Sequence, residues 1–145
     1  MEKAFSILMA ILVGICLAMQ PTINAALGKI ITPKIAAFHS VFISTIIISI
    51  VILLSGNFNE YQNIKNISPL YWIGGVLGIV IVFLSIKVVP VLGTTLSLSI
   101  FVSVQLIVGA LINHFGIFGV AKVPIDFIRF FGIILLLVGV KMVLR

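Results

Sequence analysis

Residues 35–54 read IAAFHSVFISTIIISIVILL, twenty residues without a Lys, Arg, Asp or Glu. A helix of about 20 mostly apolar residues is long enough to cross the hydrocarbon core of a bilayer. Residues 46–48 and 133–137 are uninterrupted apolar runs, whereas a membrane barrel needs apolar and polar residues to alternate. A helix also satisfies its own backbone hydrogen bonds in lipid. The stretch therefore predicts a transmembrane helix.

Four more stretches share this length and character. We expect an all-α integral membrane protein with one domain over residues 1–145 and five transmembrane helices, at about 4–27, 35–54, 70–89, 91–113 and 127–144. Pro33, Pro69, Pro90 and Pro124 each precede an expected span, where a missing N–H costs little. Pro21 lies inside the first span, and we expect it to kink that helix. The first span has no clean signal-peptide cleavage site, so we expect it to be retained.

The composition excludes several classes of protein. Of 145 residues, 62% are hydrophobic and 8% are charged, against about 25% charged residues in soluble domains. This excludes a water-soluble enzyme and a nucleic-acid module, and the basic residues behind the net charge of +6 form no patch. The single cysteine, Cys16, excludes an internal disulfide. We expect no catalytic residues, no metal and no cofactor, because no cluster of suitable side chains occurs.

The basic residues are shared almost equally between the two sides of the membrane. With five spans, the side of the N-terminus has four basic residues: Lys3, Lys65, Lys122 and Arg129. The opposite side has five: Lys29, Lys34, Lys87, Lys141 and Arg145. An excess of Lys and Arg on the cytoplasmic side normally sets orientation. The near balance predicts insertion in both orientations (dual topology) and an antiparallel homodimer, which reproduces an inverted repeat with two chains. The alternative is one orientation, set by other features or by a sister subunit.

No acidic residue lies in the middle of a span. Glu2, Glu60 and Asp126 all lie at span ends or in connections. Exporters of cationic compounds usually rely on a carboxylate inside the membrane. The sequence therefore favours neutral, zwitterionic or anionic cargo.

Polar side chains inside the spans are the candidate substrate-binding residues. Gln20 and Asn24 are four residues apart and share a helix face, where they could line a cavity or form an interhelical hydrogen bond. Polar residues of the fourth span lie within about half of its circumference. Such a face lines a water-filled cavity, or it packs against other helices while its Ser and Thr hydroxyls bond their own backbone. The candidates are Gln20, Asn24, Ser99, Ser103, Gln105 and Asn113.

Glycine spacing predicts helix packing. Gly74 and Gly78 form a G-x-x-x-G pattern, and Gly132 and Gly139 are seven residues apart. Small residues let membrane helices approach closely. His39, about one turn inside the second span, could carry protons or be a hydrogen-bonded group.

Several short patterns occur in a specific order along the chain. They are Gly14…Gln20…Asn24…Leu27, Trp72-Ile73-Gly74-Gly75…Gly78, Pro90…Gly93, Gln105-Leu106…Asn113-His114-Phe115-Gly116…Gly119, and Arg129…Gly132…Gly139. Together they resemble the YdcZ-type family (domain of unknown function 606) of the drug/metabolite transporter superfamily, related to the small multidrug resistance transporters. The chain departs from the family pattern at Val104, where the family has Gly, and at Asn113, where it has Asp. The resemblance implies a five-helix subunit of the bacterial inner membrane that works as an antiparallel pair.

These observations favour a small-molecule exporter with alternating access around a polar, carboxylate-free cavity. The alternatives are a passive dual-topology ion or solute channel and a non-transporting membrane subunit. The expected partners are the lipid bilayer, a second copy in the opposite orientation or a sister subunit, and an unidentified small molecule. We expect no nucleic-acid partner.

Overall fold

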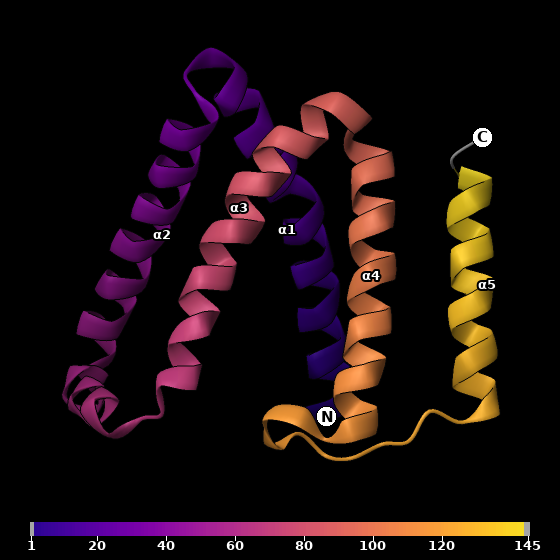
Figure 1. The fold of residues 1–145 in the computed structure, drawn as a ribbon. Coiled ribbons are helices and arrows are strands. Elements are labelled where there is room, and N and C mark those ends of the chain that lie inside the picture. The colour runs from indigo at the N-terminus through magenta and orange to yellow at the C-terminus, as the bar shows by residue number, and fades with distance from the viewer. Residues whose placement is uncertain (1, 144–145) are drawn as a thin grey trace. The chain divides into compact units, whose positions relative to one another are not determined.

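The computed structural model describes residues 2–143, without the side chains of residues 2, 57, 58, 63 and 66. Its elements are α1 (Glu2–Ile30), α2 (Pro33–Ser55), the 3-10 helices η1 (Asn57–Asn66) and η2 (Pro69–Trp72), α3 (Ile73–Leu92), α4 (Thr94–Phe115), the 3-10 turn η3 (Ile117–Gly119) and α5 (Phe127–Val143) (Figure 1). Residues 2–143 contain no β-strand. The all-helical fold class is confirmed.

Within residues 2–143, four helical stretches are long and apolar enough to cross a membrane. They are Lys3–Ile30, Pro33–Ser55, Pro69–Leu92 and Thr94–Phe115. Helix α5 has 17 residues, or about 25 Å at 1.5 Å per residue, near the lower limit for a span. Its expected last residue, Leu144, lies outside the described residues. Four candidate spans and a fifth apolar helix are thus present, and a fifth crossing stays a prediction.

Local chemistry explains where the helices begin and end. The Thr32 hydroxyl accepts a hydrogen bond from the Ile35 N–H at 3.3 Å, and Pro33 is the first residue of α2, as helix starts favour. Gly56 and Gly116 end α2 and α4 with φ of 73° and 66°, a conformation that costs glycine little.

One expected boundary is wrong. Pro90 does not precede the fourth helix but lies inside α3, which continues to Leu92. The break comes at Gly93, whose φ is 78°. Proline has the φ of a helical residue and loses only one backbone hydrogen bond here, whereas a positive φ directs the chain out of the helix. Pro21 lies inside α1, as expected.

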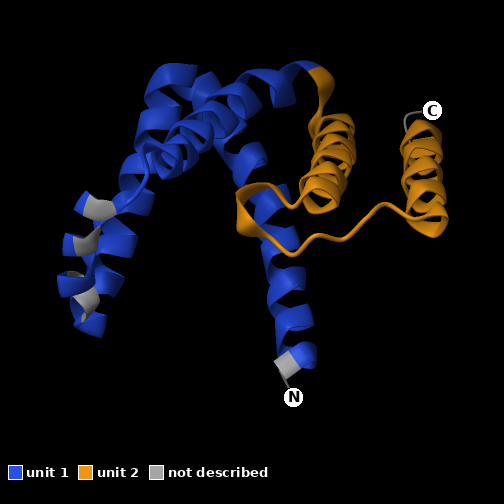
Figure 2. Ribbon diagram, turned by 60° about the horizontal axis from the view of Figure 1, so that its bottom comes forward, with its two compact units in different colours: residues 1–91 blue, residues 92–145 orange. Residues whose placement is uncertain are grey.

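The chain divides into two compact units, residues 1–91 and 92–145 (Figure 2). In the first unit α1, α2 and α3 meet beside the turn between α1 and α2 (Figure 1). The buried cluster there consists of Ala36, Ala37 and Ile86, with Leu27, Val82 and Phe83 packed against it. Two alanines and the neighbouring Gly28 leave room for Ile86, which is 1% exposed. Small residues let α1 and α2 approach closely at this point.

The second unit consists of α4, α5 and the connection between them. The connection returns to α4 through two hydrogen bonds, from the Val123 N–H to the Asn113 carbonyl at 2.8 Å and from the Ile125 N–H to His114 Nδ1 at 3.1 Å. They tie the connection to the last turn of α4, where the Asn113 carbonyl also accepts the Gly116 N–H. The C-terminal end of α4 and the start of α5 are therefore fixed to one connection.

Candidate functional site

Two pockets contain predicted site residues, one in each unit. We call the first the three-helix pocket, because α1, α2 and α3 line it. It measures about 360 Å³. Its lining residues are Gln20, Ser40, Val41, Ser44, Thr45, Ile48, Gly75, Gly78, Ile79 and Val82.

Gln20 is the polar side chain that α1 contributes to the three-helix pocket. It is exposed, and its amide has no hydrogen-bond partner within the described residues. On α2, the Ser44 and Thr45 hydroxyls donate to the carbonyls of Ser40 and Val41 one turn earlier, at 2.9 Å each. Serine and threonine often satisfy themselves in this way in apolar helices. Gln20 is therefore a lining group whose amide leaves both its donors and its acceptor unused within the described residues.

Asn24 lies one turn further along α1 and differs from Gln20. It is 7% exposed, and its Nδ2 donates a hydrogen bond to Ser40 Oγ on α2 at 3.0 Å. Of the two readings of Asn24, the structure contains the interhelical bond. Substrate binding by Asn24 stays a prediction.

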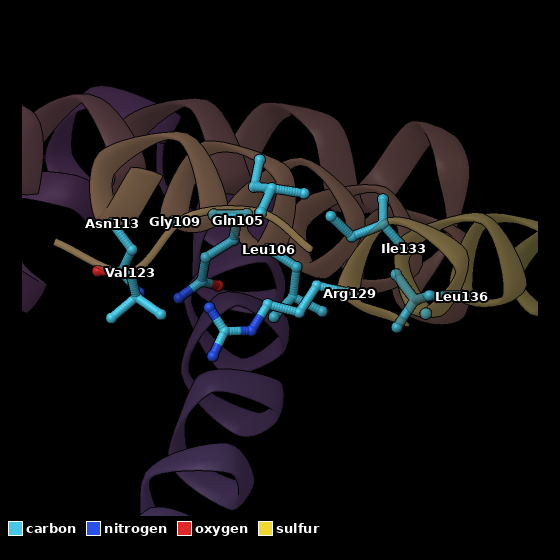
Figure 3. A pocket seen from close by; sticks show the side chains of 11 residues that line it. Gln105, Leu106, Gly109, Asn113, Val123, Arg129, Ile133 and Leu136 are labelled. Carbon is cyan, nitrogen blue, oxygen red and sulfur yellow. The ribbon is translucent and has the colours of Figure 1, made fainter. Parts of the chain in front are cut away.

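The second pocket lies between α4, α5 and their connection, and we call it the α4–α5 pocket (Figure 3). It measures about 630 Å³. Its lining residues are Gln105, Leu106, Gly109, Ala110, Asn113, Val123, Ile125, Arg129, Gly132, Ile133 and Leu136.

The α4–α5 pocket brings together two of the predicted residues. Gln105, Gly109 and Asn113 recur every four residues and so share one face of α4. The side-chain amides of Gln105 and Asn113 are exposed and have no partner in the described part of the chain. In an apolar segment an unpaired amide is costly unless water, a ligand or another chain satisfies it. This wall of the pocket can therefore both donate and accept hydrogen bonds.

Arg129 supplies the positive charge of the α4–α5 pocket. It lies in the first turn of α5, and its Nη1 donates to the Pro124 carbonyl at 3.1 Å. Figure 3 shows the side chains of Gln105 and Arg129 extending into the pocket from α4 and α5. The sequence reasoning counted Arg129 only as a flanking charge and a family-pattern residue. A signal in the sequence could have found it. Arg129 lies two residues inside an apolar span, and the preceding span, across one connection, ends with the polar residue Asn113.

Ser99 and Ser103 are not lining residues of the α4–α5 pocket. Ser103 is 5% exposed, and its hydroxyl donates to the Ser99 carbonyl at 2.7 Å. Ser97, which the sequence reasoning did not select, is fully buried and donates to the Gly93 carbonyl at 2.7 Å. These hydroxyls satisfy themselves within α4, as the packing alternative expects. Substrate binding by Ser99 and Ser103 stays a prediction.

The glycines selected for packing have open surroundings. A side chain at Gly74, Gly78, Gly132 or Gly139 would meet no described atom within 4 Å. The glycine in close contact is Gly28, where a Cβ would lie 2.5 Å from Ile86 Cγ2. These four glycines do not hold helices of the single chain together. Their role in packing stays a prediction, which would need another chain as the partner. Both histidines are outside the two linings, with His39 exposed and His114 holding the connection.

Residues 5–142 match the family described as "Putative inner membrane exporter, YdcZ". The chain belongs to the YdcZ family. The match covers nearly the whole chain and confirms the resemblance seen in the sequence. No curated protein and no solved structure matches it. This YdcZ-family chain is a multi-pass protein of the inner membrane, and its apolar helices contact the bilayer. The description of the family names an exporter, which is a transporter rather than an enzyme.

Proposed function

We propose that the chain is one subunit of a small-molecule exporter, in which two oppositely oriented copies alternate between inward-open and outward-open states. The observation that carries the proposal is the α4–α5 pocket, in which two unpaired amides and a guanidinium face apolar side chains inside a membrane helix pair. A few convergent polar groups in an apolar pocket are typical of small-molecule sites. The family name, which specifies export, supports the same function.

The antiparallel pair is supported by the balance of basic residues and by incomplete burial. Nearly the whole N-terminal half of α1 is exposed, including Phe5, Leu8, Leu12 and Ile15. Contact with lipid accounts for part of such a surface, but Gly74 and Gly139, which line neither pocket, offer faces on which a second chain could pack closely. By symmetry, two inverted copies make the two open states equal in energy.

In the proposed cycle Gln20 and Gln105 bind cargo in the three-helix and α4–α5 pockets. Both amides offer donors and acceptors that the described residues leave unused. Neither lining contains a carboxylate. Cargo recognition therefore proceeds through amides, hydroxyls and Arg129, without an acid that exchanges a proton for a cation.

The proposal is tested by measuring export. Bacterial cells express the protein, Gln20→Ala, Gln105→Ala or a matched control, Gln62→Ala, whose glutamine lies in η1 outside both pockets. We expect small molecules to accumulate in the medium with the parent and the control. Their accumulation should fall about tenfold or more for the two pocket variants, because each loses an amide that hydrogen-bonds the cargo. Mass spectrometry of the medium is the measurement.

Equal amounts of each variant in the membrane, checked by immunoblot, ensure that the comparison concerns function. If the parent exports nothing beyond an empty vector, the exporter proposal is wrong. Ohmic currents through planar bilayers would favour the channel alternative, because a channel conducts without coupling.

A further inference from the structure

Among the described residues, Arg129 supplies the one charged group that lines the α4–α5 pocket, its guanidinium. Its side chain is 50% exposed, and among the described residues its partners are the Pro124 carbonyl and, more distantly, Asp126. A guanidinium has five N–H donors in a planar fork. Most of these donors therefore remain available to a ligand.

Asp126 does not neutralise this donor fork. Its Oδ1 accepts a hydrogen bond from the backbone N–H of Arg129 at 2.8 Å, which caps α5. Its Oδ2 lies 4.0 Å from Arg129 Nε, beyond hydrogen-bond length, and its side chain is 59% exposed. Exposed pairs of this kind contribute little. Asp126 is also absent from the lining of the pocket, so the charge that the lining itself presents is positive.

The charged group of the α4–α5 pocket lies at one end, and apolar side chains follow along α5. Arg129 and Asn113 lie where α5 begins and α4 ends, and Ile133 and Leu136 follow along α5. Gln105 lies two turns before Asn113, about 12 Å along the helix. The pocket therefore matches a charged head with a short apolar body, and its 630 Å³ suits a small molecule.

We propose that the cargo bound in the α4–α5 pocket is a small organic anion, a carboxylate or similar oxyanion on an apolar body. This assignment of the substrate class rests on the proposed export function. Arginine pairs with a carboxylate through two parallel N–H···O bonds. The amides of Asn113 and Gln105 orient the remaining polar atoms, and Leu106, Ile133 and Leu136 cover the apolar body.

The test uses three probes of nearly equal shape and different charge: phenylacetate, phenylacetamide and phenethylammonium. Each is titrated by equilibrium dialysis against the full-length protein in nanodiscs of zwitterionic phosphatidylcholine. We expect phenylacetate to bind more tightly than the other two, and Arg129→Gln to weaken it about 10- to 100-fold, the worth of a charge-assisted hydrogen bond. Equal binding of the three probes, or of phenylacetate to Arg129→Gln, would overturn the proposal.

Two further variants separate the charge from other effects of substitution. Arg129→Lys keeps a positive charge, and it should keep part of the preference for the anion while losing the bidentate contact. Lys122→Gln removes a cation from the same connection but outside the lining. It should leave phenylacetate binding unchanged. If Lys122→Gln weakens binding as much as Arg129→Gln does, only the general charge of that side attracts anions, and the pocket assignment is wrong.

An anionic lipid head group has the same chemistry as a free anion. A parallel set of nanodiscs therefore contains phosphatidylglycerol, and native mass spectrometry measures lipid retained by the parent and by Arg129→Gln. Phenylacetate binding that persists against phosphatidylglycerol supports the cargo assignment. Arg129-dependent retention of phosphatidylglycerol, without phenylacetate binding in either disc, would overturn it in favour of a lipid site.

These binding measurements are independent of transport. An exporter whose cargo is unrelated to Arg129 would still lose export in Gln105→Ala but show no anion preference. A chain that binds phenylacetate through Arg129 without exporting anything would retain the anion site and lose the proposed function.

Discussion

Among the glycines of the first unit, Gly28 has the least room for a side chain. A Cβ at this position would lie 2.5 Å from Cγ2 of Ile86, a β-branched side chain that is almost fully buried and has little rotamer freedom. Gly28→Ala should therefore lower stability by about 1–3 kcal/mol through overpacking. The measurement is the loss of stability in a fixed detergent, followed by heating or by titration with a denaturing detergent.

The matched control is Gly14→Ala in the same helix, because a side chain at Gly14 would meet nothing within 4 Å. Alanine has the higher helix propensity, so this variant should be as stable as the parent or up to about 1 kcal/mol more stable. In a double-mutant cycle, Gly28→Ala should cost less stability in an Ile86→Ala background than in the parent, because the clashing Cγ2 is absent. A Gly28→Ala protein as stable as Gly14→Ala would show that α1 and α3 are not in close contact there.

Gln20 and Asn24 show how two neighbouring amides acquire different roles. Their spacing places both on one face of α1. Asn24 lies where α2 is close enough for Ser40 to accept a hydrogen bond, whereas Gln20 lies beside a pocket. Sequence spacing predicts a shared face, but which amide is already paired depends on the local distance between the helices.

Asp126 controls the start of α5 and with it the position of Arg129. The Asp126 carboxylate accepts the Arg129 backbone N–H, and its carbonyl accepts the Phe130 N–H at 3.0 Å. Asp126→Ala removes the side-chain cap and should cost about 1 kcal/mol of stability. Asp126→Asn keeps a capping oxygen and should cost less than half as much. Thermal melting in detergent compares the two, and a melting temperature for Asp126→Ala equal to that of the parent would contradict the capping role.

The connection between α4 and α5 is an ordered part of the fold. His114 Nδ1 accepts the Ile125 N–H, so this ring nitrogen carries no proton in the hydrogen bond. The sequence predicted the end of the fourth helix at about Asn113, two residues before its observed end at Phe115. It did not predict that the same end binds the connection and thereby brings Arg129 into one pocket with Asn113.

The orientation of the whole chain can be tested by shifting its charge balance. Four basic residues against five give almost no bias, so three lysines added after Met1 or after Arg145 should lock opposite orientations. An antiparallel exporter should lose export in each locked form alone and regain it when both are expressed together. Full export by one locked form alone would exclude the antiparallel pair.

Orientation itself is read by cysteine labelling. Cys16→Ala removes the one native thiol of the chain and is the background for a single cysteine appended after Arg145. For the unlocked chain we expect about half of the molecules to be labelled by an impermeant thiol reagent before permeabilisation, and nearly all or none for each locked form. All-or-none labelling of the unlocked chain would require an oppositely oriented sister subunit instead.

The sequence by itself determined the helical membrane class, the family and the approximate limits of the helices. These features depend on local hydrophobicity, length and turn residues, which act over one segment at a time. Even so, the sequence analysis placed Pro90 before the fourth helix, whereas it lies inside α3. A proline near a boundary is compatible both with the last turn of one helix and with the start of the next.

The tertiary structure decided which polar groups are satisfied and which face a pocket. Asn24 meets Ser40 across 16 residues of sequence, and Arg129 lines one pocket with Gln105 across 24. Such pairs depend on how closely helices approach and on how a connection folds back, not on the periodicity of either helix. In lipid, an amide without a hydrogen-bond partner costs free energy. The approach of the helices therefore decides which polar residues are paired within the protein and which remain to bind cargo.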